Sequence, residues 1–310
     1  MKLIVQIPCW NEEKTIGNMI RSIPQNIDGI EIIEILVIDD GSTDNTVHKA
    51  KEAGATKVIS LPRHKGLAAA FSAGAETALQ MKGDLLVNTD ADMQYPSDYI
   101  SALIDPILRG RADMTIGDRL SSLHKPFSPP KMLLQRIGST VVRVLSGIQV
   151  KDAASGFRAF NKDAMKSLFI HDNFSYTMES IFLAGANRLR VENVPIKTNP
   201  QTRDSRLFKS IGQYIRRSAI TILRISLMYH PLRFFIIMGM VLLFAAFLIG
   251  VRFLYFFFLG SGSGHVQSLI LLAVLATMGV QSIMVGMVAD VVAANRRLLE
   301  IMRIKQMENL

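Results

Sequence analysis

Residues 84–94 read Asp-Leu-Leu-Val-Asn-Thr-Asp-Ala-Asp-Met-Gln, and this stretch indicates the fold. The apolar run at residues 85–87 predicts a short buried β-strand, and Tyr95 and Pro96 interrupt the pattern just after it. Asp90 and Asp92 are one residue apart beyond that strand, so both carboxylates can reach one hard divalent cation. The stretch therefore predicts a site for Mg²⁺ or Mn²⁺ that is shared with substrate phosphates.

Strand-like and helix-like segments alternate through the first ninety residues. Strands are expected at about residues 3–8, 33–39, 57–61 and 84–90. This alternation predicts βαβ units and a mostly parallel sheet, in which ligands bind beyond the carboxyl ends of the strands. Polar motifs follow three of these strands, at residues 9–13, 39–44 and 90–94, and we expect them to converge on one crevice.

The hydrophobic content of 49% is high for a soluble enzyme, and the excess is local. Between residues 234 and 289 the only charged side chain is that of Arg252. Two apolar spans, at about 232–258 and 266–290, each exceed the ~20 residues needed to cross a bilayer. They predict two transmembrane helices joined by a short turn. Arg252 is either a functional intramembrane charge or a side chain that snorkels to the far interface beside an aromatic belt.

Basic residues flank both spans, whereas the turn between them has none. The flanking Lys and Arg residues are Arg206, Lys209, Arg216, Arg217, Arg224 and Arg233 before the first span, and Arg296, Arg297, Arg303 and Lys305 after the second. The positive-inside rule therefore predicts that both termini are cytoplasmic. Residues 206–230 contain no Asp or Glu and carry apolar residues at helical spacing, which predicts basic amphipathic juxtamembrane helices on an anionic leaflet.

Four motifs follow one another over some ninety residues. They are P-x-W-N-E at residues 8–12, D-D-G-S-T-D at 39–44, G-L-A-x-A at 66–70 and D-A-D-M-Q at 90–94. With these motifs the chain resembles the family-2 glycosyltransferases of the GT-A fold. Looser matches at residues 117–119, 155–158 and 203–206 make it similar to the polyprenyl-phosphate sugar transferases, which include dolichyl-phosphate mannose synthase and undecaprenyl-phosphate glucosyltransferases.

The resemblance implies an α/β architecture with four parts. Residues 1–205 would form a GT-A (Rossmann-like) catalytic domain with a mostly parallel sheet, and residues 206–230 the juxtamembrane helices. Residues 231–295 would form a two-helix transmembrane hairpin, and residues 296–310 a basic cytoplasmic tail. The catalytic domain would then lie on the cytoplasmic side of a cell membrane, either an inner bacterial membrane or one of the endoplasmic-reticulum type.

The implied reaction is the inverting transfer of a hexose from a GDP- or UDP-sugar to a polyprenyl phosphate on the cytoplasmic leaflet, with Mg²⁺ or Mn²⁺. Two alternatives stay open: transfer to a saccharide or another lipid, and a non-catalytic membrane scaffold of the same fold. The chain lacks the Q-x-x-R-W signature of processive polysaccharide synthases, and its only tryptophan is Trp10. Its net charge of +9 comes without a nucleic-acid-binding motif, so we expect no nucleic-acid partner.

Candidate donor-site residues come from the strand ends and from the resemblance. Asp90 and Asp92 are the predicted metal ligands, and Asp39 or Asp40 is expected to accept hydrogen bonds from the base or ribose. The third strand is followed by residues placed to approach the nucleotide, namely Arg63, Lys65 and Gly66. The resemblance adds Pro8, Asn11 and Glu12 to the nucleotide pocket and places Gln94 beside the metal and the acceptor. Asp92, Gln94 and Arg119 form the predicted catalytic set.

The acceptor requires positive charge, because two anionic phosphates must come together, and arginine binds phosphate in a bidentate manner. The candidate lipid-phosphate ligands are Arg119, Arg136, Arg158 and Arg203. Glu179 is a candidate base or sugar contact. Some relatives carry Asp where this chain has Gly156, which leaves Asp152 as a possible replacement. Cys9 is expected to serve packing, and glycines such as Gly239, Gly279 and Gly286 either support a homo-oligomer or pack the hairpin on itself.

Overall fold

The computed structural model describes residues 1–120, 129–168, 170, 176–200, 216, 220, 223–224, 227–229, 231–259 and 266–308. Of residues 129–131, 133–134, 300–301 and 303–308 it describes only the backbone. The chain divides into two compact units, Met1–Leu223 and Arg224–Leu310. The first contains the predicted catalytic domain and is called the catalytic unit. Most of the predicted juxtamembrane segment, residues 206–230, lies outside the described residues, as does Arg203.

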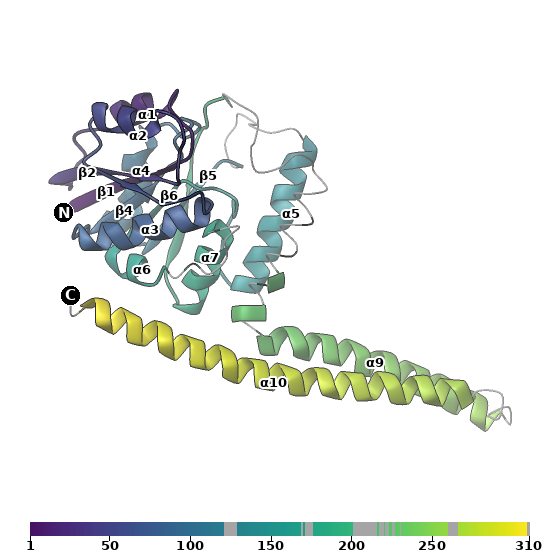
Figure 1. The fold of residues 1–310 in the computed structure, drawn as a ribbon. Coiled ribbons are helices and arrows are strands. Elements are labelled where there is room, and N and C mark those ends of the chain that lie inside the picture. Colours follow the sequence, from purple (N-terminus) through teal and green to yellow (C-terminus); the bar gives the residue numbers. More distant parts are fainter. Residues whose placement is uncertain are drawn as a thin grey trace. The chain divides into compact units, whose positions relative to one another are not determined.

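A seven-stranded sheet forms the centre of the catalytic unit (Figure 1). Its strands, in spatial order, are β3 (Lys57–Ser60), β2 (Ile32–Asp39), β1 (Lys2–Cys9), β4 (Leu85–Asn88), β6 (Arg158–Asn161), β5 (Met114–Asp118) and β7 (Val191–Pro195). Strands β3, β2, β1 and β4 are mutually parallel, as are β5 and β7, whereas β6 runs antiparallel to both of its neighbours. The predicted mostly parallel α/β sheet is therefore confirmed.

Helices cover both faces of this sheet (Figure 1). One face carries α1 (Ile16–Ser22), α2 (Thr46–Glu52) and α4 (Tyr99–Leu108), and the other carries α3 (Leu67–Gln80), α6 (Lys162–Lys166) and α7 (Tyr176–Ala186). Because side chains alternate along a strand, Leu3, Val5 and Ile7 of β1 join the core beneath α1 and α4. Helix α5 (Pro129–Ser146) lies beside α7 rather than over the centre of the sheet.

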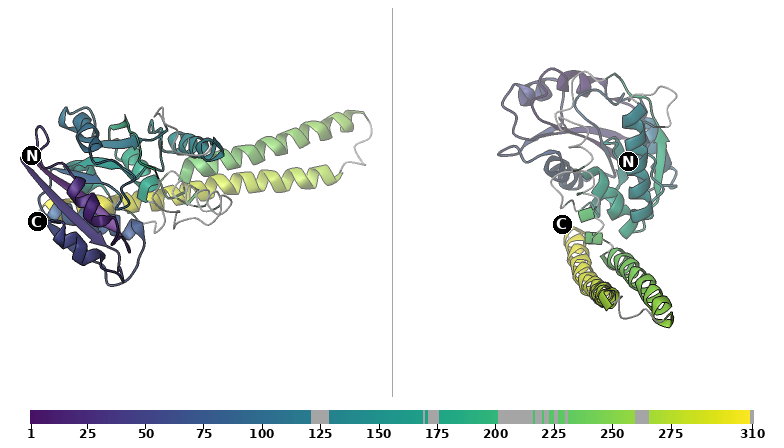
Figure 2. Two further views of the ribbon diagram at one scale, coloured as in Figure 1. Left: turned by 90° about the horizontal axis from the view of Figure 1, so that it is seen from above. Right: turned by 90° about the vertical axis from the view of Figure 1, so that its right-hand side faces the viewer.

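The second unit contains two long apolar helices that run side by side (Figures 1 and 2). They are α9 (Pro231–Phe258) and α10 (Val266–Glu308), and their most apolar windows reach mean hydropathies of 2.8 and 2.1. Only 11% and 17% of those windows are buried, so the helices expose their apolar side chains. Both are long and apolar enough to cross a bilayer. Helix α10 continues through residue 308 and so includes most of the predicted tail.

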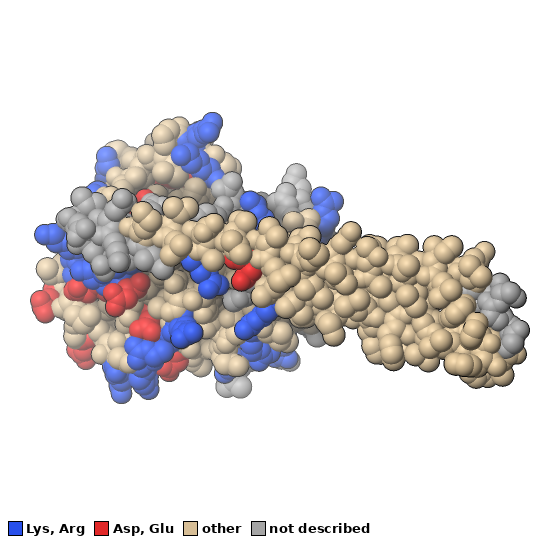
Figure 3. Space-filling model, turned by 90° about the horizontal axis from the view of Figure 1, so that it is seen from below, with Lys and Arg blue, Asp and Glu red and all other residues tan. Residues whose placement is uncertain are grey.

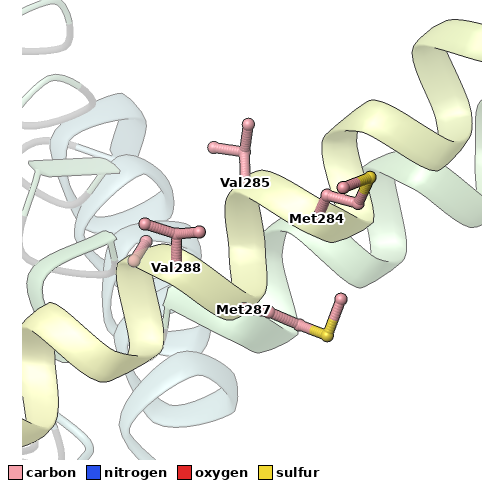
Figure 4. A pocket seen from close by; sticks show the side chains of 5 residues that line it. Met284, Val285, Met287 and Val288 are labelled. Carbon is pink, nitrogen blue, oxygen red and sulfur yellow. The ribbon is translucent and has the colours of Figure 1, made fainter.

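The outer surface of the hairpin is apolar, as expected of a surface that contacts lipid. Figure 3 shows a long stretch of these helices without acidic or basic side chains. On α10, Met284, Val285, Met287 and Val288 project from the helix (Figure 4) and line an apolar hollow of about 450 Å³. All four side chains are more than half exposed, which would be unfavourable in water.

Glycines bring α9 and α10 into close contact. A Cβ atom on Gly239 would lie 2.7 Å from the carbonyl oxygen of Gly279. A Cβ atom on Gly279 would lie 3.0 Å from the carbonyl oxygen of Gly239. A Cβ on Gly286 would meet the side chain of Phe235 at 2.7 Å. The hydroxyl of Ser282 donates to the backbone oxygen of Phe235 at 3.1 Å. Of the two predicted uses of these glycines, the structure therefore shows the packing of the hairpin on itself.

We predict that Gly279→Leu loosens the hairpin, because its side chain would overlap Leu243 and the backbone of α9. Overpacking of this kind costs about 1–3 kcal/mol. Hydrogen exchange in α9 and α10, measured by mass spectrometry in detergent, should become faster. Val280→Leu places the same side chain at the next position, which is 51% exposed, and should leave exchange unchanged. Equal exchange rates in the two variants would contradict this packing.

Candidate active site

Three strand ends place the predicted motifs along one edge of the sheet. Strand β1 lies between β2 and β4, and all three are parallel, so their carboxyl ends are neighbours. The segment after β1 carries Asn11 and Glu12, the end of β2 carries Asp39 and Asp40, and the segment after β4 carries Asp90 and Asp92. In a parallel sheet this edge is the usual position of a ligand site.

The segments after β1 and β2 are held together by hydrogen bonds. Asn11 has a positive φ of 53°, and its Oδ1 accepts from the backbone N–H of Thr43 at 2.8 Å. The backbone N–H of Asn11 donates to Ser42 Oγ, and that of Glu12 donates to Thr46 Oγ1, both at 2.8 Å. Asp39 is buried, and its Oδ1 accepts from the N–H of Ser42 at 2.9 Å. The two predicted nucleotide-binding motifs therefore form one preorganised wall.

The carboxylate of Asp40 holds the segment after β3. Its Oδ1 accepts from the backbone N–H of Lys65, and its Oδ2 from that of Gly66, both at 2.8 Å. His64 Nδ1 also lies 2.8 Å from Oδ2, and the imidazole stacks on Trp10 with ring centroids 4.2 Å apart. Both oxygens of Asp40 thus bind the protein, which favours Asp39 in the predicted contact to base or ribose. The prediction did not include His64, because only the folded chain brings it to Trp10 and Asp40.

The segment that carries Asp90 and Asp92 is a tight turn. Met93 has a positive φ of 59°, and Asp92 Oδ1 accepts from the backbone N–H of Gln94 at 3.0 Å. Asn199, in the segment after β7, donates from Nδ2 to the backbone oxygen of Met93 at 2.9 Å. Its backbone N–H donates to the backbone oxygen of Gln94 at 3.0 Å. Asn199 thus braces the turn from more than a hundred residues away, a contact for which the sequence has no local signal.

Gly156 packs directly against the carboxylate of Asp90. A Cβ atom on Gly156 would lie 3.4 Å from both carboxylate oxygens and 2.8 Å from the hydroxyl oxygen of Tyr176. The backbone N–H of Gly156 donates to the Tyr95 hydroxyl at 3.1 Å, and its carbonyl accepts from Asn88 Nδ2 at 2.9 Å. The absence of a side chain at residue 156 therefore makes room for the Tyr176 hydroxyl next to the Asp90 carboxylate.

The two tyrosines beside this carboxylate are fully buried, and both remain protonated at neutral pH. Burial raises the pKa of Tyr95; the positive charge of Arg119 opposes this rise, and the negative charge of Asp90 adds to it. Burial, followed by the charge of Asp90, raises the pKa of Tyr176 well above its usual value. Protonated phenols can donate hydrogen bonds and carry no charge that would repel Asp90.

The donor set fits a divalent ion that is shared with substrate. Asp90 and Asp92 supply hard carboxylate oxygens at a strand end. Within the described part of the chain, no group of three or more His, Cys, Asp and Glu side chains is arranged to hold a metal. An ion held by one or two carboxylates that takes its other ligands from phosphates and water is typical of Mg²⁺ sites in phosphate-transfer enzymes.

Arg119, at the end of β5, forms a buried ion pair instead of presenting an open phosphate ligand. Its Nε lies 2.7 Å from Asp152 Oδ2, and its Nη2 lies 3.0 Å from Asp152 Oδ1. Asp152 is fully buried, and Arg119 is 6% exposed. Burial alone would lower the pKa of Arg119, but the negative charge of Asp152 and the hydrogen bonds to it raise the net pKa. Asp152 is thus occupied by Arg119.

Arg158 is also engaged by the protein. Its guanidinium is fully buried and donates to the backbone oxygens of Ser155, Ala153 and Thr177 and to the hydroxyl of Ser180. Burial lowers its pKa to about 10, so it stays charged at neutral pH. These contacts tie β6 to α7 and leave Arg158 unsuited to the predicted contact with a lipid phosphate, a use that assumed an open side chain.

The other predicted residues occupy varied positions. Arg136 is exposed on α5, Glu179 is fully buried on α7, and Arg203 lies outside the described residues. Pro8 is part of β1 and pairs with Ile38 of β2. Cys9 is 5% exposed, and burial, followed by the charge of Asp39, raises the pKa of its thiol, as expected of a packing residue rather than a nucleophile.

Comparison with known proteins agrees with this geometry. Residues 4–169, more than half of the chain, match the model for glycosyl transferase family 2. This chain belongs to that family. It is therefore a glycosyltransferase, as predicted from its four motifs.

Named relatives extend the comparison. The chain is 31% identical to the UDP-N-acetylglucosamine–dolichyl-phosphate N-acetylglucosaminyltransferase of Methanococcus voltae, over 62% of this chain and 83% of that protein. It is 32% identical to the dolichol-phosphate mannosyltransferase of Pyrococcus furiosus, over 70% of this chain and 62% of that protein. The resemblance to polyprenyl-phosphate sugar transferases is thus confirmed. The crystal structure of glucosyl-3-phosphoglycerate synthase from Mycobacterium tuberculosis shares the fold, with a TM-score of 0.57, 23% identity and coverage of 73% and 80%.

We predict that Gly156→Ala lowers sugar transfer by about 10- to 100-fold, because the new methyl group must displace the Tyr176 hydroxyl and would touch the Asp90 carboxylate beside it. Transfer rates measured against metal concentration should show that more metal is needed for half-maximal activity. Gly17→Ala adds a methyl group at ordinary contact distance, 3.6 Å from Arg21, and should keep the normal rate. An unchanged metal response in Gly156→Ala would show that Gly156 does not control the position of Asp90.

We predict that Asp152→Ala destabilises the catalytic unit by about 3–5 kcal/mol, because it leaves the buried charge of Arg119 without its partner. Trp10, the only tryptophan, allows urea unfolding of this unit to be followed by fluorescence. Asp105→Ala breaks exposed ion pairs with Arg109 at 2.8 Å and with Arg111 at 3.5 Å, and it should cost at most about 1 kcal/mol. Similar losses in both variants would refute the buried-pair interpretation.

Proposed function

We propose that this glycosyltransferase moves a hexose from a nucleotide-diphospho-sugar to a polyprenyl phosphate in the membrane, with inversion at the anomeric carbon. The observation that carries the proposal is the combination, in one chain, of two carboxylates one residue apart at the carboxyl edge of the sheet and a hairpin long and apolar enough to span a bilayer. Relatives whose names specify dolichyl-phosphate acceptors support it. A membrane anchor suits an acceptor whose tail stays in lipid while its phosphate reacts.

Asp90 and Asp92 are the proposed ligands of a Mg²⁺ or Mn²⁺ ion. When bound, such an ion neutralises the developing charge on the leaving pyrophosphate. Support comes from the same synthase of M. tuberculosis, whose structure with Mn²⁺ and UDP-glucose shares the fold at a TM-score of 0.54. Gly156 and the two buried tyrosines lie around the Asp90 carboxylate, and the backbone N–H of Gln94 donates to Asp92 Oδ1.

The nucleotide is proposed to lie along the wall formed by the segments after β1 and β2. Pro8, Asn11, Glu12 and Asp39 would line this pocket, with Asp39 accepting from the base or ribose. Asp40 contributes indirectly, because it fixes the backbone of Lys65 and Gly66 next to the pocket. In this arrangement the bound Asp40 carboxylate shapes the site, and the Lys65 side chain is placed to meet a phosphate.

The acceptor side needs no general base in this proposal. A phosphate monoester has a second pKa near 6, so the attacking oxygen of a polyprenyl phosphate is already anionic at neutral pH. Arg136 is exposed and is retained as a lipid-phosphate ligand, as is Arg203, whereas Arg158 is left out. Arg119 is proposed to act by positioning Tyr95 and the segment around Asp152. The full burial of Glu179 favours an internal contact over a role as base.

We place the catalytic unit and both termini on the cytoplasmic side. Basic residues flank the two helices, and the residues that join them carry no Lys or Arg, which supports this topology by the positive-inside rule. Arg252 lies six residues before the end of α9, with its guanidinium carbon 5.8 Å from the centre of the Phe256 ring. This position suits a side chain that reaches the far interface.

The test is sugar transfer by the purified full-length protein to a short polyprenyl phosphate. GDP-mannose, UDP-glucose, UDP-galactose and the UDP-N-acetylhexosamines are offered separately with Mg²⁺ or Mn²⁺, and products are identified by mass. We expect one lipid-linked sugar, whose formation is abolished by EDTA and reduced at least about 100-fold in Asp92→Asn. Asp98→Asn, on an exposed side chain without a capping bond, is the control and should stay active.

The other outcomes distinguish the alternatives. Donor hydrolysis without a lipid product would indicate a different acceptor, such as a saccharide. Full activity of Asp92→Asn, or an unchanged rate in EDTA, would refute the proposed metal site. Absence of both turnover and nucleotide-sugar binding would refute the catalytic function and favour a scaffold.

A further inference from the structure

A chain of buried amide side chains crosses the centre of the sheet. Gln6 of β1 and Asn88 of β4 are register partners in neighbouring strands, and both are fully buried. Gln6 Nε2 donates to Asn88 Oδ1 at 2.8 Å. Asn88 Nδ2 in turn donates to the carbonyl oxygen of Gly156 at 2.9 Å and to the hydroxyl oxygen of Tyr176 at 3.0 Å. The amide chain thus runs from β1 to the first residue of α7.

Backbone carbonyls fix the direction of this amide chain. If the Asn88 amide were turned over, its oxygen would face the Gly156 oxygen at 2.9 Å, so its NH₂ group must face Gly156. Its oxygen then faces Gln6, which must present its own NH₂ group, and the second hydrogen of that group points to the carbonyl of Phe71 at 3.4 Å. Gln6 therefore keeps the Asn88 amide from turning and keeps its NH₂ group on the Tyr176 hydroxyl.

These residue types are unfavourable at this place. Strands of a parallel sheet that is covered on both faces are normally apolar. Gln6 Oε1 is buried without a hydrogen-bond partner among the residues that the structure describes, and such burial costs free energy. A Cβ atom on Gly74, in the middle of α3, would meet Gln6 Cδ at 2.8 Å, so the helix carries glycine where alanine would favour it. Several local rules broken together at one place indicate a functional constraint.

The amide chain ends beside a proposed metal ligand. Tyr176 is 1% exposed, and its ring stacks on that of Phe71 with centroids 4.1 Å apart. Its hydroxyl donates to the Gly156 carbonyl at 3.3 Å, which is long for an O–H···O bond. A Cβ atom on Gly156 would lie 2.8 Å from this hydroxyl and 3.4 Å from the Asp90 carboxylate oxygens, so both groups face the same point. Because a carboxylate is a stronger acceptor than a carbonyl, the hydroxyl hydrogen is placed to serve Asp90.

We propose that Gln6 and Asn88 are positioning residues for the sugar transfer, because they hold the Tyr176 hydroxyl against the Asp90 carboxylate. The hydroxyl then restricts the carboxylate to the orientation that binds the metal ion of the donor. Loss of an outer partner that orients a metal ligand typically lowers metal affinity by about 10- to 100-fold. This inference deepens the proposed function and rests on it, since the use of Asp90 as a metal ligand is part of that proposal.

The test measures binding at the donor site without transfer. Binding of radiolabelled UDP and of GDP to the purified full-length protein is followed as Mn²⁺ is increased, with no acceptor present. Gln6→Met keeps the unbranched shape of the side chain and removes its hydrogen bonds, and Tyr176→Phe removes the hydroxyl and keeps the ring on Phe71. We expect each variant to need about 10- to 100-fold more Mn²⁺ for half-maximal binding. Urea unfolding, followed by the fluorescence of Trp10, shows whether each variant is folded.

Thr115→Val is the matched control. Thr115 is fully buried in β5, outside the amide chain, and its hydroxyl donates to the backbone oxygen of Leu103 at 2.7 Å. The variant therefore loses one buried hydrogen bond at the same sheet. It should unfold at lower urea and should bind nucleotide at the normal Mn²⁺ concentration. If its Mn²⁺ requirement rises as much as that of Gln6→Met, general loosening explains the effect and the positioning role is overturned.

A double variant decides whether Gln6 acts through the Tyr176 hydroxyl. Gln6→Met combined with Tyr176→Phe should need no more Mn²⁺ than Tyr176→Phe alone, because the group that Gln6 positions is already absent. Effects that multiply in the double variant would overturn the proposed route. If Gln6→Met does not fold, Gly74→Ala takes its place, because its methyl group displaces the same carboxamide from the side of α3.

Failure of the proposed function gives a different result from failure of this inference. If the unmodified protein binds neither nucleotide at any Mn²⁺ concentration, the donor site is refuted, and the positioning role is refuted with it. If the unmodified protein binds a nucleotide with Mn²⁺ and Gln6→Met and Tyr176→Phe bind it equally well, only the positioning role is refuted.

Discussion

Burial of charge at the carboxyl edge of the sheet is the constraint on which the site depends. A charged group that leaves water must gain partners, or its burial costs several kcal/mol. Arg119 and Asp152 satisfy this requirement through a two-point ion pair, Arg158 through four hydrogen bonds, and Asp40 through two backbone amides and His64. Most of these contacts join segments that are distant in sequence, such as Arg119 with Asp152 and Arg158 with α7. The same pairing that makes burial possible therefore makes the walls of the crevice rigid.

The second constraint is close packing, which in both units requires glycine because a side chain would not fit. In the catalytic unit, Gly156 allows the Asp90 carboxylate, the Tyr95 hydroxyl and the Tyr176 hydroxyl to meet around one backbone segment. In the hairpin, Gly239 and Gly279 allow two helices to approach until a backbone oxygen of one lies against the other. A methyl group at these positions would overlap atoms that belong to the backbone or to a well-packed side chain.

Some surfaces of the chain are suited to water, and others are suited to lipid. Helices α9 and α10 expose apolar side chains along most of their length, and α5 exposes a narrower apolar stripe with arginines beside it. In water both features would be unfavourable, whereas the hairpin matches the hydrocarbon core of a bilayer. A glycosyltransferase whose acceptor is a lipid would gain from such a membrane anchor, because the anchor keeps the enzyme and its acceptor in the same membrane.

The sequence by itself determined the parts of this protein that depend on local pattern. Alternating strands and helices predicted the parallel sheet, the length of the apolar runs predicted the two long helices, and four motifs predicted the family. Because parallel strands end at one edge, the position of Asp39, Asp90 and Asp92 followed as well. These inferences need only the period of the hydrophobic pattern and the spacing of residues along the chain.

Only the tertiary structure decided how individual side chains are used. Arg119 pairs with Asp152, 33 residues away, Gly156 packs on Asp90, and Asn199 braces the turn at Met93, and none of these contacts leaves a local pattern in the chain. The sequence near an arginine does not show whether its side chain is exposed to a phosphate ligand or buried in the protein. Helix α5 likewise has two faces, and tertiary packing decides which of them is buried: Ser139 Oγ accepts from the backbone N–H of Ala153, 14 residues away. Long-range packing, which composition and periodicity do not encode, makes those choices.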